Sequence, residues 1–148
     1  MTIFGVYPTQ DKWNERRDWV EKQLLDRSES GSFLVSEHAT TLFMDMQLAF
    51  CAGAWLSVVI TSISVIDAQL RETEAANDSI GTAKLLNDYY KGEEINWLRQ
   101  LRNKYVHHNI ANPTNDTSNW YNNQNELEKH ATKAMQMTIH AFFQSPGT

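Results

Sequence analysis

A chain of 148 residues with 41% hydrophobic residues is long enough for one domain with a hydrophobic core and too short for two. It contains only six glycines and three prolines, which argues against a turn-rich β architecture and favours helices. The net charge of −5 argues against a protein that coats nucleic acid non-specifically, because such binding depends on neutralising many phosphates. Any contact with nucleic acid must then be local.

The single cysteine and the apolar stretches bear on the cellular compartment. Cys51 cannot form an intramolecular disulfide or a multi-cysteine zinc site, and we interpret it as a buried, inert thiol. The first residues lack the pattern of a signal peptide. The most apolar stretch, 48–66, carries four serines or threonines and is typical of a buried core helix, not of a membrane span. We therefore expect a cytoplasmic protein with no membrane partner.

The spacing of apolar residues predicts the first helices in chain order. An amphipathic helix is expected over 9–27, with Thr9 as its N-cap, and the polar run SESGS follows as a turn. Between 33 and 74 there is no proline, and one apolar seam continues throughout. This pattern predicts a single long helix with a bend near Gly53. Asp67 is the charged residue on the seam, and it must lie near the rim or meet a cation, since burying an unpaired carboxylate is costly.

Three more helices complete the predicted domain. They are expected over 80–90, from Glu93 and Glu94 to about His108, and from residue 119 or 123 to 144. Short loops between helices are typical of antiparallel neighbours in a bundle. We therefore predict one all-α domain over 1–148, an up-and-down bundle of four to five helices, with residues 1–8 and 145–148 flexible.

The segment LRQLRNKYVHHN, residues 98–109, is the candidate functional stretch. Between Glu94 and Asp116 there is no acidic residue, whereas Arg99, Arg102 and Lys104 form a local basic island. A helical wheel divides the segment into two faces. The buried face is expected to hold Trp97, Leu98, Leu101 and Tyr105. The opposite face holds Arg99, Arg102, Asn103, Val106 and His107, while His108 points back toward the bundle.

An arginine beside a histidine suits a phosphodiester. Guanidinium binds phosphate through two hydrogen bonds, and imidazole can move protons near neutral pH. On RNA, His107 could act as general base or acid while Arg102 stabilises negative charge in the transition state. This chemistry requires no metal or other cofactor. A plainer interpretation stays open, because positive charges near the C-terminus of a surface helix also complement the helix dipole.

The residues RNKYVH, Arg102 to His107, resemble the defining motif of the HEPN family: an arginine, usually followed by a polar residue, and a histidine after four to six positions. The leucine-rich turn LRQLRN before the motif is also similar to the family's pattern. So are the earlier stretches SVIDAQLRE and IGTAKLLND, where an acidic residue often stands at the position of Asp67. The resemblance covers about residues 35 to 144 and implies a HEPN-like bundle.

The resemblance implies a metal-independent endoribonuclease that acts on single-stranded RNA in a toxin, defence or stress setting. Its cleft would form where two motifs meet across a homodimer. Arg102, His107 and Asn103 would be catalytic, and Arg99, Lys104 and His108 would bind substrate. The apolar seam separately predicts that Asp67 approaches and orients Arg102, His107 or His108, with a purely structural role as the alternative. An antitoxin or nucleotidyltransferase partner is also implied. The toxin branch often carries a tyrosine two places after the histidine, where this chain has Asn109.

The sequence also allows a function without catalysis, and it contains further histidines and a tryptophan that could contact a ligand. Some family members do not cleave RNA, so the alternative is a non-catalytic helical module that binds a nucleotide or a protein partner. His38, His130 and His140 lack a second ligand type at metal-like spacing, and we predict no metal site. Trp120 could stack on a base, although anchoring the last helix is the simpler role.

Overall fold

The computed structural model describes residues 4–29, 31, 33–111 and 115–145. Over these residues the chain forms seven α-helices and one π-helical turn, with no β-strand, so the all-α prediction is confirmed. The helix number exceeds the four to five expected. The predicted flexible residues 1–3 and 146–148 lie outside the described residues. The elements are α1 (Gln10–Ser28), α2 (Glu37–Ala52), α3 (Trp55–Leu70), η1 (Arg71–Ala75), α4 (Thr82–Tyr89), α5 (Ile95–Val106), α6 (Thr117–Asn122) and α7 (Gln124–Phe143).

Side-chain caps explain where three of the helices begin. The Thr9 hydroxyl accepts a hydrogen bond from the Lys12 amide at 3.1 Å, which confirms Thr9 as the N-cap of α1. The Ser36 hydroxyl accepts from the Ala39 amide at the start of α2, also at 3.1 Å. The Asp116 carboxylate accepts from the Asn119 amide at 2.7 Å and begins α6. These caps satisfy amide groups that have no partner inside the helix.

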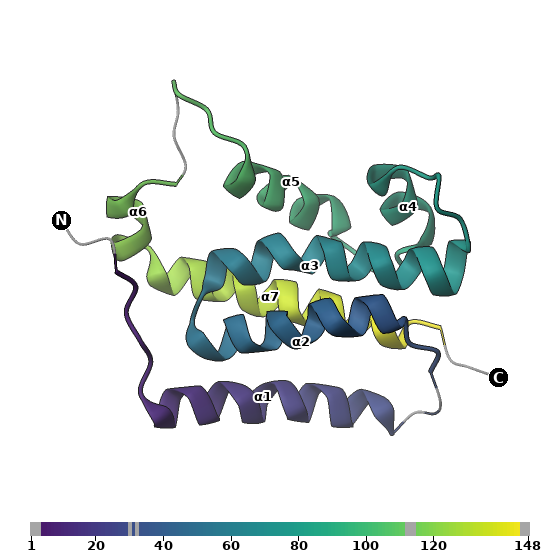
Figure 1. Cartoon of the computed structure of the whole chain (residues 1–148), viewed down its shortest axis with the longest axis horizontal. Coiled ribbons are helices and arrows are strands. Elements are labelled where there is room, and N and C mark those ends of the chain that lie inside the picture. The colour runs from purple at the N-terminus through teal and green to yellow at the C-terminus, as the bar shows by residue number, and fades with distance from the viewer. Residues whose placement is uncertain (1–3, 30, 32, 112–114, 146–148) are drawn as a thin grey trace.

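The single long helix predicted over 33–74 is wrong, because the chain reverses at Gly53. Gly53 has a φ of 77°, a left-handed conformation, and its amide donates to the carbonyl of Phe50 at 3.1 Å. The Ala54 amide donates to the carbonyl of Ala49 at 2.9 Å, which completes a helix C-cap. The apolar seam continues on the far side of the break, so α2 and α3 pack against each other as antiparallel neighbours (Figure 1). Apolar residues three and four positions apart occur both in one long helix and in two antiparallel helices joined by a turn, so the sequence pattern does not distinguish these two arrangements.

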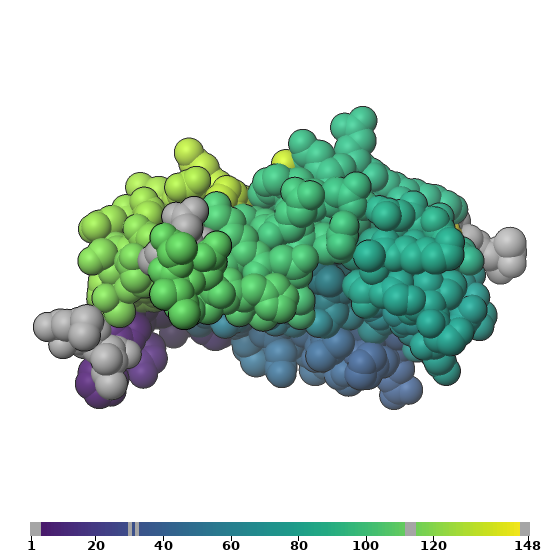
Figure 2. All heavy atoms as spheres, turned by 90° about the horizontal axis from the view of Figure 1, so that it is seen from above, coloured from purple at the N-terminus to yellow at the C-terminus, as the bar shows by residue number. Residues whose placement is uncertain are grey.

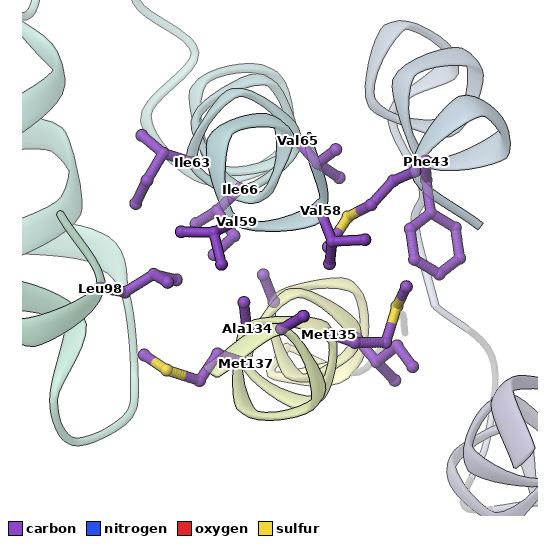
Figure 3. Close-up of a cluster of buried hydrophobic side chains, with 14 of the residues drawn as sticks. Phe43, Val58, Val59, Ile63, Val65, Ile66, Leu98, Ala134, Met135 and Met137 are labelled. Carbon is purple, nitrogen blue, oxygen red and sulfur yellow. The ribbon is translucent and has the colours of Figure 1, made fainter. Parts of the chain in front are cut away.

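The core lies between α3 and α7, with α2 and α5 on its flanks (Figure 3). Val58, Val59 and Ile66 of α3 face Ala134 and Met135 of α7, and all five side chains are buried. In Figure 1, α1 covers α2 on one side of this core, and α4 and α5 lie over α3 on the other. The helix that carries the candidate motif therefore forms part of the outer layer.

Two further predictions concern Cys51 and the apolar stretch 48–66. Cys51 is a free, buried cysteine, and burial raises the pKa of its thiol despite the opposing charges of Arg16 and Arg17. This confirms the prediction of a buried thiol. Within the described ranges, no helix combines the length and apolar character that crossing a membrane requires.

Candidate functional site

Helix α5 is held against the bundle by the face that the wheel assigned to the core. Leu98 is fully buried, and Ile95 and Leu101 are nearly so. Trp97 and Tyr105 are half-buried and pack on the same cluster. Glu94 at the start of α5 forms an ion pair with Lys133 of α7, whose ammonium group lies 4.2 Å from the ring centre of Trp97. The predicted buried face of α5 is confirmed.

The end of α5 differs from the prediction and changes the placement of both histidines. The helix ends at Val106, and His107 is its C-cap with extended backbone angles, φ −93° and ψ 123°. The His107 amide still donates to the carbonyl of Asn103 at 2.8 Å. Since His108 lies beyond the helix, its predicted direction toward the bundle does not apply. The side chains of His107 and His108 are both exposed.

Arg99, Arg102 and Asn103 line a cavity of about 1080 Å³ on the opposite side of α5 from Tyr105. Four helices and the chain before α4 contribute to its walls: His38 and Leu42 from α2, Ser64 and Asp67 from α3, and Thr82 from α4. Figure 2 shows the hollow between green α5 and teal α4. Its volume slightly exceeds the range typical of small-molecule sites, about 300–1000 Å³.

The two arginines of this wall lack a carboxylate partner among the residues that the structure describes. The Nε atoms of Arg99 and Arg102 are buried and have no hydrogen-bond partner there. Within the described residues the guanidinium of Arg102 makes one hydrogen bond, a long one from Nη1 to Oδ1 of the neighbouring Asn103 at 3.4 Å. Buried polar groups in native proteins are rarely left unsatisfied, so these two call for an explanation. In the described part of the chain these two guanidinium groups have no carboxylate partner and could bind an anion, while the carboxylates of Asp67, Glu72 and Asp78 also line the cavity.

Asp67 lies on the same cavity and has its own cation. Its two oxygens accept hydrogen bonds from Nε and Nη2 of Arg71, each at 3.0 Å, and Oδ2 also accepts from the Thr82 hydroxyl at 2.7 Å. Burial acts to raise the pKa of Asp67, but the bonds from Arg71 and Thr82 and the charge of Arg71 outweigh it and lower that pKa. The expectation that a carboxylate on the seam meets a cation is confirmed. That it orients Arg102, His107 or His108 stays a prediction.

Arg71 is a charged cavity residue that the sequence patterns did not single out. Beyond its pair with Asp67, its Nη1 donates to the carbonyls of Ile80 at 2.6 Å and Asn77 at 3.2 Å. It therefore ties α3 to the segment that leads into α4. Opposite charges four residues apart on a helix are a recognisable signal, so Asp67 and Arg71 could have been paired from the sequence. The π-helical turn that Arg71 begins has no such signal, and turns of this kind often occur at functional sites.

The remaining predicted site residues lie outside this cavity. Lys104 is exposed and lines a second, smaller cavity on the other side of α5, together with Tyr105 and Trp120. His107 and His108 are not among the residues that line the arginine cavity. One chain thus brings together Arg99, Arg102, Asn103 and Asp67, with His107 at the end of the same helix.

Among the described residues, no group of three or more His, Cys, Asp or Glu side chains is arranged to hold a metal ion. No family model, no curated protein and no solved structure matches this chain. The class that fold and site define is an all-α bundle whose outer layer carries an arginine-lined cavity.

Proposed function

We propose that this chain is a metal-independent endoribonuclease of the HEPN type that cleaves single-stranded RNA. The observation that carries the proposal is the pair of arginines on α5, Arg99 and Arg102, which line an open cavity without a carboxylate partner among the described residues. A backbone phosphate supplies the missing negative charge, and guanidinium is the group best suited to bind it. Exposed His107 at the end of the same helix supplies a proton carrier.

The proposed reaction is an attack of the RNA 2′-oxygen on the adjacent phosphorus. The 2′-hydroxyl loses its proton to a base as the new P–O bond forms, and the bond to the 5′-oxygen breaks as that oxygen takes a proton from an acid. The products are a 2′,3′-cyclic phosphate and a 5′-hydroxyl, so no further reactant is needed. His107 exchanges the protons, and Arg102 stabilises the charge on the phosphorane-like transition state. Asn103 positions His107 or the phosphate, and Arg99, Lys104 and His108 hold the strand.

A second copy of the chain completes the proposed site. Within one chain His107 is not among the residues that line the cavity beside Arg102, and a second chain could bring its own His107 to that cavity. Val106 and Ile110, on either side of the histidine pair, are 42% and 86% exposed. Exposed apolar residues beside a motif favour a contact with another chain, and a twofold axis there would place two motifs face to face.

The cellular setting belongs to the same proposal. An RNase of this type acts in the cytoplasm as a toxin, defence or stress factor and is held inactive by an antitoxin or nucleotidyltransferase partner. Expression of the wild-type chain would then arrest growth, and expression of a His107→Ala variant would not.

The test is cleavage of an end-labelled single-stranded RNA by the purified chain with and without EDTA. We expect cleavage that persists in EDTA and leaves 2′,3′-cyclic phosphate ends. His107→Ala and Arg102→Ala should each lower the rate about 100-fold or more, as expected for loss of a general acid or base or of an electrostatic donor. Arg17→Ala is the matched control, because Arg17 is exposed on α1 and, among the described residues, forms an ion pair only with its neighbour Asp18. If both site variants cut as fast as wild type, the proposed site is wrong.

A non-catalytic binding module is the second candidate, and one observation favours it. His107 does not line the arginine cavity. An anionic ligand could therefore bind in this cavity without being cleaved. The same samples separate the two functions. RNA or a nucleotide that binds to wild type, binds more weakly to Arg102→Ala and is never cleaved would favour the binding module.

A further inference from the structure

A second cavity lies on the other side of α5, between the C-terminal half of that helix, α6 and the start of α7. Its volume is about 580 Å³, within the range of about 300–1000 Å³ typical of small-molecule sites. Leu56, Leu101 and Leu127 make its apolar part, and Tyr105 and Trp120 add aromatic rings. The motif helix is therefore flanked by two cavities of different chemistry, one lined by arginines and one by aromatic rings.

The polar groups around this second cavity include three side-chain amides, together with Lys104, Thr117, His130 and the carboxylates of Asp116 and Glu126. Asn115, Asn119 and Asn123 line it, each with a carboxamide that can both donate and accept hydrogen bonds. Asn115 already donates to the carbonyl of Tyr105 at 2.6 Å, which fixes this wall to the last turn of α5. Aromatic faces combined with amide edges are the surroundings that proteins use for unpaired bases.

Tyr105 is a rigid and uncharged part of the wall. Its hydroxyl lies 3.0 Å from Nδ1 of His130, whose ring packs edge-on against Trp97 at 5.7 Å between ring centres. Burial, reinforced by the charge of Glu126, raises the pKa of Tyr105 to about 12. The phenol therefore stays neutral at physiological pH and does not repel a polyanion.

The position of this cavity relative to the motif suggests its ligand. Tyr105 lies two residues before His107, and the exposed ammonium of Lys104 is at the cavity edge without an ion-pair partner in the described part of the chain. In the proposed complex, a strand whose phosphate is bound at Arg102 passes the end of α5, where Lys104 can hold the next phosphate. The neighbouring base is then close to the aromatic rings.

We propose that the cavity lined by Trp120, Tyr105 and the three asparagines binds one unpaired nucleobase of the RNA beside the scissile phosphate. The base stacks on the ring of Trp120, and the carboxamides meet its polar edge. This inference rests on the proposed RNA-cleaving function and deepens it, because it assigns base contacts to one side of α5 and phosphate contacts to the other.

The test measures binding of an uncleavable RNA, with 2′-deoxy sugars at the cleavage position, by fluorescence anisotropy. Trp120→Leu keeps apolar bulk but removes the stacking surface, and it should raise Kd roughly 10-fold. An RNA with one abasic sugar at the contacted position should bind wild type with a similar loss, and it should bind Trp120→Leu without a further loss. Trp13→Leu is the control, because Trp13 is a half-buried tryptophan on α1, away from this cavity.

The possible failures are distinguishable. If wild type cleaves RNA but Trp120→Leu, verified as folded by circular dichroism, binds as tightly as wild type, the base site is wrong and the proposed function stands. A second variant, Asn123→Ala, covers the case in which Trp120→Leu does not fold, and it should also weaken binding to the complete RNA but not to the abasic one. If wild type neither binds nor cleaves RNA, both proposals are overturned.

Discussion

At position 53 the backbone adopts a conformation that residues with a side chain rarely accept. Gly53 has a φ of 77°, and a Cβ atom there would lie 3.1 Å from Nη1 of Arg16. That same Nη1 donates to the carbonyl of Cys51 at 3.1 Å and so satisfies an acceptor at the end of α2. Gly53 thus permits the turn between α2 and α3. It also leaves room for Arg16 of α1 to bind the carbonyl of Cys51 at the end of α2.

We predict that Gly53→Ala lowers the free energy of unfolding by about 1 to 2 kcal/mol, which is the cost of a left-handed conformation for a residue with a Cβ atom. Urea denaturation followed by circular dichroism measures it. Gly5→Ala is the control, because no atom lies within 4 Å of the Cβ it would add, and it should change stability by less than about 0.5 kcal/mol. An unchanged midpoint for Gly53→Ala would contradict the role assigned to this turn.

At the level of elements, the arginine cavity depends on how α3, its π-helical end and α4 are joined. Asp67 and Arg71 are one helical turn apart, and their bonds reach Thr82 and the carbonyls of Asn77 and Ile80. These contacts fix the wall that faces α5. The side chains of Asp67 and Arg71 are each only 19% exposed, so this pair differs from an ordinary surface ion pair.

We predict that Asp67→Asn lowers the free energy of unfolding by about 1 to 2 kcal/mol at pH 7. This loss is larger than that expected for an exposed ion pair on a helix and smaller than that expected for a fully buried charged hydrogen bond. Asp88→Asn is the matched control, since Lys84 and Asp88 also form a pair four residues apart but are 72% and 44% exposed. It should cost only a few tenths of a kcal/mol. Equal effects of the two variants in urea denaturation would show that Asp67 has no special structural role.

The same pair predicts a pH dependence of stability. The pKa of Asp67 is lower in the folded chain than the ordinary 3.8, so its contribution is complete above pH 3.8 and is lost as pH falls through the folded value. The difference in unfolding free energy between wild type and Asp67→Asn should therefore stay constant from pH 7 to about pH 5 and shrink toward zero in stronger acid. A difference that persists unchanged below the folded pKa would indicate that the carboxylate charge is not its source.

At the scale of the whole molecule, residues from four helices meet at the arginine cavity, while His107 projects from the end of α5. Figure 1 shows the chain after α5 rising away from the other helices, so this end of the motif is open to a second molecule. In the proposed function a second chain completes the cleavage site at this end.

We predict that RNase activity per chain falls on dilution in proportion to the fraction of dimer measured by analytical ultracentrifugation. The reason is that a site built from two motifs exists only in the dimer. Val106→Asp places a charge beside His107 and should shift the equilibrium toward monomer and lower activity at the same time. Activity per chain that stays constant where the protein is monomeric would rule out a composite site.

Several features followed from the amino-acid sequence by itself. The all-α class, the N-cap at Thr9 and the buried face of α5 depend on spacing within a few turns of chain, and residue types a few positions apart express that spacing directly. The Arg102, Asn103 and His107 motif was also readable there, although its activity is a proposal.

Only the tertiary structure decided the rest. The reversal at Gly53 and the end of α5 at Val106 involve contacts with distant segments, such as Arg16 with Cys51 and Asn115 with Tyr105. The cavity is the clearest case, because the packing of α2, α3, α4 and α5 places Arg99 and Arg102 on the same surface as Asp67 and Arg71. Local periodicity specifies which face of a helix is buried, but not which distant residues it will meet.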